Sequence, residues 1–239
     1  MKKSRDRVAL VTGGTRGIGF AIARRLASDG FAVAISGRTE ASVQTALEKL
    51  RKEKPDAAGF VADARREEDQ ESLIASVEQT FGRLDVLVNN AGIGEFGPVD
   101  RLEPERFRAV VETNLLGPYY AIRAAAPLMK RSGGGFVVNI ASLASINAFA
   151  GGAAYNASKF GLLGLSDAAM LDLRHDGIRV AAVLPGSVAT EIGDSHAGRE
   201  SSWMLSPEDV AEAVADLVRF PDRALPSRIE LRPTRPPKK

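Results

Sequence analysis

Tyr155 and Lys159, four positions apart, are the two residues of this chain best suited to acid–base chemistry. On a helix, side chains with this spacing lie one above the other on the same face. A nearby ammonium group favours the phenolate, so Lys159 is expected to bring the pKa of Tyr155 toward neutrality. Ser142, across an intervening loop, is placed to hold a carbonyl oxygen beside the phenol. Together the three side chains indicate a site that protonates an oxygen while another group attacks its carbon.

A glycine-rich segment lies between the first β-rich run of the chain and an amphipathic stretch. Residues 12–19 read Thr-Gly-Gly-Thr-Arg-Gly-Ile-Gly. A strand, a glycine turn and a helix in this order are the context that a dinucleotide-binding loop requires. Gly13 and Gly17 would let the backbone approach a pyrophosphate, and Gly19 would let the helix pack on the strand. A tight connection without a ligand is the other interpretation.

The second predicted strand, residues 31–36, ends without the acidic residue that binds the ribose in NAD sites. Gly37 and Arg38 follow it instead, and Arg16 projects from the glycine loop. Two guanidinium groups without a carboxylate suit a 2′-phosphate, so we predict NADP rather than NAD. The alternative is that both arginines are solvated surface residues.

Strand-like runs alternate with helical patterns along the rest of the chain. Further strands are expected over 58–62, 84–88, 135–140 and 178–184, and one long helical pattern covers 104–130. This alternation predicts right-handed βαβ units and a parallel sheet covered by helices on both faces.

Polar residues stand at the ends of several predicted strands, where such sheets bind ligands. Asp63 follows the third strand, and its carboxylate could accept a hydrogen bond from an adenine amine. Asn89 and Asn90 begin an Asn-Asn-Ala-Gly run that ends at Gly92, and we assign Asn89 a structural role. Asn114 lies among apolar neighbours in the long helical pattern, where a buried amide needs a hydrogen-bond partner.

Composition excludes several classes of function. The 239 residues are 44% hydrophobic and 26% charged, which suits a single α/β domain with an apolar core. The net charge is only +2, so nucleic-acid binding is not indicated. The absence of cysteine excludes disulfides and thiolate ligands, and His175 and His196 lack ligand spacing, so we expect no metal site and solvent-facing histidines. The charged N-terminal segment lacks the apolar region of a signal peptide, so we expect a cytoplasmic protein.

These segments resemble the short-chain dehydrogenase/reductase family over nearly the whole chain. The matching motifs are T-G-x-x-x-G-x-G at 12–19, N-N-A-G at 89–92, Y-x-x-x-K at 155–159, a serine thirteen residues before the tyrosine, and Pro185-Gly186 after the sixth strand. The resemblance implies an α/β fold with a Rossmann-type, doubly wound parallel sheet of about seven strands, in a single domain spanning 1–239.

The resemblance also implies roles for individual residues. Tyr155 would be the acid/base, Lys159 would bind the nicotinamide ribose and lower the pKa of the tyrosine, and Ser142 would orient the carbonyl. Asn114 would anchor a water through which protons reach Lys159. Val188 and Thr190 would hold the carboxamide. The implied cofactor-binding residues are Gly13, Thr15, Arg16, Gly17, Ile18, Gly19, Arg38, Asp63, Asn90, Gly92, Tyr155, Lys159, Pro185, Gly186, Val188 and Thr190.

We therefore expect an NADP(H)-dependent oxidoreductase that transfers hydride between nicotinamide and a ketone, an aldehyde or a secondary alcohol. Two alternatives stay open: a 3-oxoacyl-thioester (acyl-carrier-protein) reductase, and a non-catalytic NADP-binding sensor or subunit. The segment 191–205 corresponds to a flexible lid in the family, and its composition suggests a small or medium substrate with an apolar part.

The resemblance implies a homodimer or homotetramer through the helices that carry Asn114 and Tyr155. At the C-terminus, Ile229 and Leu231 are compatible with an edge strand. The Pro-rich basic tail over 233–239 is expected to be mobile, which puts tetramer packing at that end in doubt.

Overall fold

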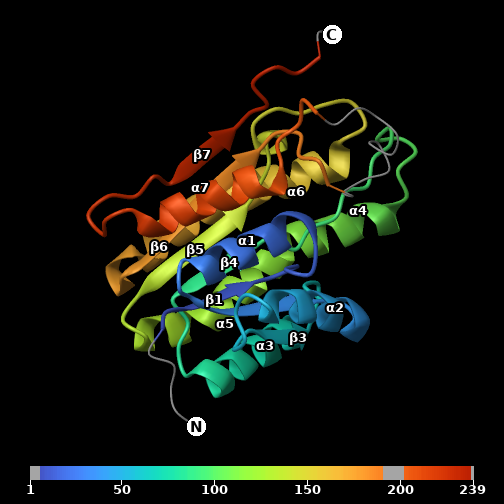
Figure 1. Cartoon of the computed structure of the whole chain (residues 1–239). Helices are drawn as coiled ribbons and strands as arrows, with labels where there is room; N and C mark the ends of the chain where they lie inside the picture. Colours follow the sequence, from blue (N-terminus) through green and yellow to red (C-terminus); the bar gives the residue numbers. More distant parts are fainter. Residues whose placement is uncertain (1–5, 191–201, 238–239) are drawn as a thin grey trace.

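The computed structural model describes residues 6–190 and 202–237 (Figure 1). Seven parallel strands form one sheet in the order β3-β2-β1-β4-β5-β6-β7, which confirms the predicted doubly wound sheet. The chain begins in the middle of the sheet at β1, winds to one edge through β2 and β3, and then adds β4 to β7 on the other side. Because the direction of winding reverses between β1 and β4, the carboxyl ends of these strands frame a crevice for a ligand.

The strands are β1 (Val8–Val11), β2 (Ala32–Gly37), β3 (Ala58–Val61), β4 (Val86–Asn89), β5 (Gly135–Ile140), β6 (Ile178–Pro185) and β7 (Arg228–Leu231). The α-helices are α1 (Gly17–Ser28), α2 (Glu40–Arg51), α3 (Glu67–Phe81), α4 (Pro104–Val111), α5 (Gly117–Arg131), α6 (Ala153–Leu173) and α7 (Pro207–Arg219). Three short turns complete the described structure: the π-helical η1 (Glu112–Leu116) and the 3₁₀ turns η2 (Leu143–Ser145) and η3 (Arg174–Asp176).

Both faces of the sheet are buried, because alternate residues of each strand point to opposite sides. Ala9 and Val11 of β1 belong to the core shared with α1, α2 and α7. Val8 and Leu10 belong to the core shared with α3 and α5. Figure 1 shows α1 and α7 side by side in front of the strands and α5 behind them. A strand that packs on both sides needs a continuous apolar run, as the four fully buried residues of β1 illustrate.

Local sequence signals set several helix ends. Ser206 and Asp209 form a capping box at the start of α7, with Pro207 in its first turn. The helix that carries Tyr155 is followed by η3 and then by Gly177, whose φ of +72° ends it in the left-handed conformation.

The long helical pattern over 104–130 is not one regular helix. The turn η1 separates α4 from α5, and the backbone N–H of Gly117 donates to the carbonyl of Glu112 in the wider π spacing. Pro118 follows without an N–H to donate, which weakens the regular α-helical ladder at this point. Single π turns are frequent at functional sites, and this one contains Asn114.

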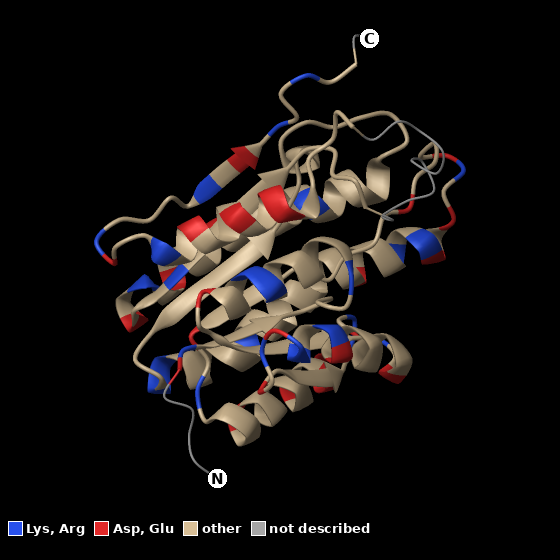
Figure 2. Cartoon of the chain, in the orientation of Figure 1, with Lys and Arg blue, Asp and Glu red and all other residues tan. Residues whose placement is uncertain are grey.

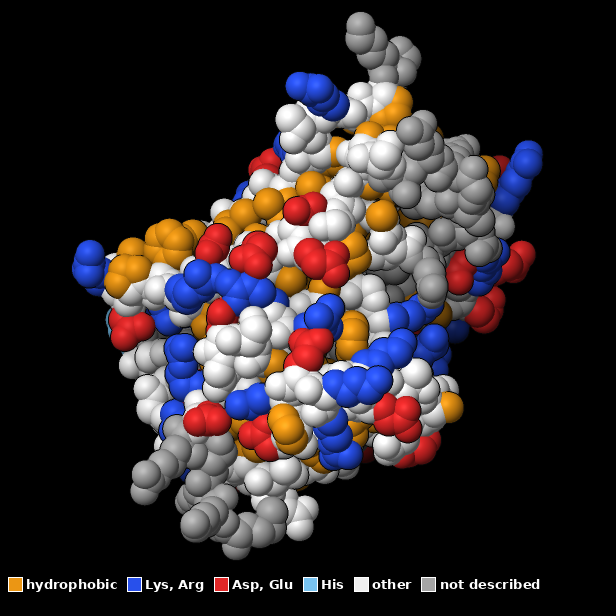
Figure 3. Space-filling view, viewed as in Figure 1, with side chains coloured by type: hydrophobic (Ala, Val, Ile, Leu, Met, Phe, Trp, Pro, Cys, Tyr) orange, Lys and Arg blue, Asp and Glu red, His pale blue; other side chains and the backbone are white. Residues whose placement is uncertain are grey.

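The C-terminal segment forms the edge strand expected from the apolar residues Ile229 and Leu231. β7 pairs in parallel with β6, with Ile229 opposite Val183 and Leu231 opposite Pro185. Among the described residues, no helix combines the length and the apolar character needed to cross a membrane. Acidic and basic residues are scattered over the ribbon, and both kinds of side chain are mixed on the face that carries α1 and α7 (Figures 2 and 3).

Candidate active and cofactor site

A cleft of about 490 Å³ lies where β1, β2, β3 and β4 end. Segments that follow these strands line it, together with residues 189–190 after β6. The sequence-predicted cofactor residues that line the cleft are Gly13, Thr15, Arg16, Gly17, Ile18, Gly19, Arg38, Asp63, Asn90, Gly92 and Thr190. The parallel sheet therefore gathers residues from distant parts of the chain at one edge.

The glycine loop between β1 and α1 requires glycine for conformation and for close approach. Gly13 and Gly17 have φ of +62° and +53°, which L side chains rarely adopt. A Cβ atom on Gly13 would lie 2.8 Å from the Cα of Ala91, and one on Gly19 would collide with the carbonyl of Gly13 and the amide of Asn90. Glycine is needed at position 19 because the Gly13 backbone and the Asn90 side chain lie against it. The expectation that Gly19 lets the helix pack on the strand is therefore corrected.

Asn90 ties the glycine loop to the end of β4. Its amide Nδ2 donates to the carbonyl oxygens of Thr12 and Gly13, each at 3.0 Å. Asn89 points elsewhere: it is buried, and its Nδ2 donates to Asn139 Oδ1 at 2.8 Å. Asn89 thus links β4 to β5 and does not line the cleft, in agreement with the structural role assigned to it.

The arginines predicted to bind a phosphate, Arg16 and Arg38, are exposed and line the same cleft. Thr39 and Ser42, which the sequence reasoning missed, lie beside Arg38 in the lining. Thr39 caps α2 by accepting a hydrogen bond from the backbone N–H of Ser42, and the two hydroxyls are 2.9 Å apart. The sequence feature that could have revealed them is a Thr three positions before a Ser directly after a strand, which is typical of a helix N-cap.

Asp63 is held by Arg65, a contact that the sequence reasoning did not include. Arg65 Nε lies 3.0 Å from both carboxylate oxygens of Asp63, and the Arg65 backbone N–H also donates to it. These hydrogen bonds to Arg65, with a smaller contribution from the charge of Arg38, lower the pKa of Asp63. An adenine amine would therefore share this carboxylate with Arg65.

The residues predicted from the sequence to transfer a proton come together next to the cleft. Tyr155 and Lys159 lie on α6, and Ser142 lies two residues after the end of β5 and hydrogen-bonds to the Tyr155 side chain. Lys159 is 5% exposed, and its Nζ donates to the carbonyl of Ile140 at 2.9 Å. That Nζ is 5.8 Å from the centre of the Tyr155 ring. The site thus contains a phenol, a hydroxyl and an ammonium in one group.

The expected lowering of the Tyr155 pKa is wrong for this structure. Burial raises the pKa of Tyr155, and the hydrogen bond with Ser142 offsets only part of that effect. Burial also lowers the pKa of Lys159 to about 8. The ammonium is bound to the Ile140 carbonyl rather than to the phenol, so desolvation dominates the pKa of Tyr155.

Both polar atoms of the Asn114 side chain form hydrogen bonds to neighbouring segments. Its Oδ1 accepts from the backbone N–H of Ile93, and its Nδ2 donates to the Ile93 carbonyl, both at 2.9 Å. The same Nδ2 lies 3.1 Å from Ser158 Oγ. The π turn therefore anchors the segment after β4 to the helix of Tyr155.

Five predicted cofactor residues do not line the cleft: Tyr155, Lys159, Pro185, Gly186 and Val188. Lys159 lies directly behind the lining, because a Cβ on Gly92 would be 3.8 Å from its Nζ. Gly186 packs against Pro233, and Val188 pairs with Leu205. Thr190, by contrast, faces the glycine loop, with its Cγ2 3.6 Å from a Cβ built on Gly17.

Part of the predicted lid falls outside the described residues, namely 191–201 with His196, as do residues 238–239 of the tail. Within the described part, Leu205 exchanges backbone hydrogen bonds with Ser187 and Ala189. His175 is exposed, as predicted.

Comparisons with known proteins agree with this geometry. The sequence profile of the family "short chain dehydrogenase" matches residues 7–200. A 3alpha-hydroxysteroid dehydrogenase of Mediterraneibacter gnavus is 38% identical over 190 residues, covering 79% of this chain and 76% of that protein. A putative ketoacyl reductase of Streptomyces coelicolor is 38% identical over 225 residues, covering 93% and 86% of the two chains. The solved structure of an actinorhodin polyketide ketoreductase variant with NADPH superimposes with a TM-score of 0.89 at 35% identity, covering 98% of both chains.

Proposed function

This chain belongs to the short-chain dehydrogenase family, and from that membership we propose that it is an NADP(H)-dependent oxidoreductase that interconverts a ketone or aldehyde and the corresponding alcohol. The observation that carries the proposal is the grouping of Tyr155, Ser142 and Lys159 beside the glycine-lined cleft. A protein that only sensed the dinucleotide would have no use for a half-buried phenol next to a hydroxyl and an ammonium group.

Three observations support a dinucleotide in the cleft. The positive φ angles of Gly13 and Gly17 bring backbone within reach of a pyrophosphate, and α1 begins at Gly17 with its positive dipole end toward the cleft. Arg16 and Arg38 would hold a 2′-phosphate, which favours NADP over NAD. A solved relative that superimposes over 98% of the chain contains NADPH.

The bound nicotinamide would supply or accept the hydride, which is chemistry that no protein side chain provides. Tyr155 would donate a proton to the carbonyl oxygen during reduction. The raised pKa of Tyr155 keeps the phenol protonated around neutral pH and therefore suits this direction. Ser142 would hold the same carbonyl oxygen and so fix its distance from the phenol.

Substitution of Tyr155→Phe tests the assignment of the proton donor. We expect NADPH-dependent ketone reduction to fall by about 10²- to 10⁴-fold, because this range is typical for loss of a general acid. The affinity for NADPH, followed by fluorescence titration, should change little. Tyr120→Phe on α5 is the matched control and should keep full turnover. Unchanged turnover in Tyr155→Phe would refute the role of this residue.

We also propose that the chain forms a homodimer through α6. Phe160 and Leu171 are 46% and 51% exposed, although both are large apolar residues. Gly164 and Ala168 lie between them at helical spacing and are exposed, and a Cβ on Gly164 would meet nothing within 4 Å. This apolar stripe can accept a second helix, as expected for a contact between two copies of α6.

A further inference from the structure

Two phenylalanines lie beside Tyr155 and expose much of their surface. Phe96, in the segment after β4, has its ring centre 5.7 Å from that of Tyr155. Phe149, in the loop before α6, has its ring centre 5.9 Å from that of Phe96. Phe96 is 38% exposed and Phe149 is 48% exposed. Exposed phenyl rings next to a proton donor mark an apolar contact surface.

The loops that carry these rings are held in place. The backbone N–H of Gly97 donates to the carbonyl of Gly151 at 2.9 Å, and Gly97 pairs with Gly152. The ring of Phe149 packs directly on Gly152, where a Cβ would lie 2.7 Å from it. The two segments thus support each other, and the backbone positions of both phenylalanines are preorganised.

Asn156 fixes the Phe149 loop to the helix that carries Tyr155. This residue is buried, and its Nδ2 donates to the carbonyls of Ala144 and Asn147 at 2.8 and 3.2 Å. Its Oδ1 accepts from the backbone N–H of Phe149 at 3.3 Å. Because Asn156 directly follows Tyr155 on α6, the backbone of Phe149 is tied to the same turn of helix that carries the phenol.

Charge near the rings is already neutralised. Glu95, the neighbour of Phe96, accepts a hydrogen bond from Arg106 Nε at 2.9 Å. Within the described residues, the surface that the two tilted rings offer is therefore apolar, with the nearby charge of Glu95 already paired.

We propose that Phe96 and Phe149 form an aromatic clamp that selects carbonyl substrates and alcohols with an aromatic ring next to the reacting carbon. The proposal rests on the oxidoreductase function proposed above and names its substrate class. A ring stacked against Phe96 would hold the attached carbonyl near Tyr155, because the two aromatic rings are in contact. Small alkyl ketones would lack this contact and would be bound and oriented less well.

The clamp is tested with two methyl ketones that differ in the group beside the carbonyl, acetophenone and 2-butanone, each at saturating NADPH. The wild-type kcat/KM for acetophenone should exceed that for 2-butanone by about tenfold or more, the scale of a good apolar subsite. Phe96→Leu and Phe149→Leu should each lower kcat/KM for acetophenone by about 3- to 10-fold, the range of one aromatic contact, and change that for 2-butanone less than about twofold. Phe220→Leu at the end of α7, where the ring is 42% exposed, is the control and should change neither.

A binding measurement separates failure of the clamp from failure of the oxidoreductase function. Acetophenone is titrated calorimetrically into protein saturated with NADP⁺, where no reduction can occur. If acetophenone binds, both leucine variants weaken that binding, and the wild type turns over neither ketone, the clamp stands and the oxidoreductase function is overturned. Turnover with equal kcat/KM for both ketones, or equal losses for both in the variants, would overturn the clamp and keep the function. Neither binding nor turnover would overturn both.

Discussion

Lys159 is an ammonium group kept almost completely out of water. It is 5% exposed, and the bond from its Nζ to the Ile140 carbonyl only partly replaces its lost hydration. Its pKa of about 8 lies below the ordinary lysine value of 10.5 because burial disfavours the charged form. At about 1.4 kcal/mol per pH unit, keeping this lysine charged costs roughly 3 kcal/mol below pH 8. A residue retained at such a cost is a candidate for function rather than for stability.

Lys159→Met should therefore stabilise the fold at neutral pH. Removing the charge recovers its desolvation cost, while the Ile140 carbonyl loses its donor, so we expect a net gain of roughly 1–2 kcal/mol in unfolding free energy. Between pH 8 and 10.5 the unfolded chain keeps this proton and the folded protein has released it, so wild-type stability rises with pH there. The advantage of the variant must shrink across that window.

Urea unfolding at neutral pH and near pH 10 measures both effects. Lys49→Met at an exposed position of α2 is the control and should show neither. A variant that is less stable than wild type at neutral pH, or whose gain does not change with pH, would contradict the desolvation argument.

Arg38 decides the choice of cofactor if the 2′-phosphate binds where we propose. We expect Arg38→Ala to weaken NADPH binding by about 10-fold or more, the value of one or two charge-assisted hydrogen bonds, and NADH binding by less than about threefold. Parallel fluorescence titrations with the two cofactors measure the difference. Arg24→Ala on α1, paired with Glu53, is the control. Equal losses for NADPH and NADH would place the phosphate elsewhere.

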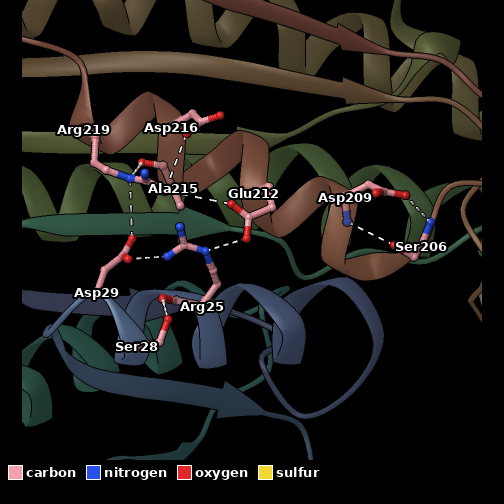
Figure 4. A network of polar contacts seen from close by, with 9 residues as sticks. All are labelled: Arg25, Ser28, Asp29, Ser206, Asp209, Glu212, Ala215, Asp216 and Arg219. Carbon is pink, nitrogen blue, oxygen red and sulfur yellow. Dashed lines mark hydrogen bonds and ion pairs between the residues drawn. The ribbon is translucent and has the colours of Figure 1, made fainter.

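At the scale of elements, α7 is fastened to α1, the helix that begins at the glycine loop. Residues of both helices pack in the core on that face of the sheet, and an ion-pair network covers the contact (Figure 4). Arg25 of α1 pairs with Asp29 and, at 2.7 Å, with Glu212 of α7. Arg219 of α7 approaches Asp29 at 3.8 Å. Apolar packing supplies most of the contact energy, since partly exposed ion pairs contribute only about 0–1 kcal/mol each.

Arg25→Met is expected to lower the free energy of unfolding by roughly 1 kcal/mol. The Arg25 side chain is only 21% exposed and forms ion pairs with both Asp29 and Glu212. Molar salt should reduce the loss, since screening weakens the pairs in the wild type. Arg24→Met removes a single ion pair, with Glu53, that is more exposed. It should lower the free energy of unfolding by less than about 0.5 kcal/mol. Urea unfolding at low and high salt measures both variants. A loss in Arg25→Met that salt leaves unchanged would mean that packing, not charge, holds α7.

At the scale of the whole molecule, the face that carries α1 and α7 mixes both signs of charge (Figure 3). The exposed stripe on α6, from Phe160 to Leu171, is the surface through which we expect a second copy to bind. The proposed dimer would bury these side chains and bring two copies of the helix that carries Tyr155 together.

Phe160→Glu should convert this dimer into a monomer. Each introduced carboxylate would be buried at an apolar contact and would lose hydration without gaining a partner. Light scattering coupled to gel filtration gives the mass directly, and Phe220→Glu, just after the end of α7, is the matched control. A wild-type monomer, or a variant with the mass of the wild-type dimer, would refute this interface.

Much of the fold could be predicted because its signals are local. The glycine loop, the capping box of α7 and the continuous apolar strands each depend on neighbours in sequence, and the glycine loop has the form expected of it. The long helical pattern around Asn114 was harder, since periodicity over 104–130 cannot reveal the one extra residue of a π turn. The anchoring of Ile93 by Asn114 depends on that turn.

By itself the sequence determined the order of strands and helices, the glycine positions and the set of residues able to transfer a proton, because residue type and spacing encode these properties. Only the tertiary structure decided which of these residues meet. The contact between Arg65 and Asp63 and the clamp around Tyr155 depend on how loops fold at the edge of the sheet. It also decided the direction of the pKa shifts, since Tyr155 and Lys159 lose water only when β5, α6 and the segment after β4 close around them.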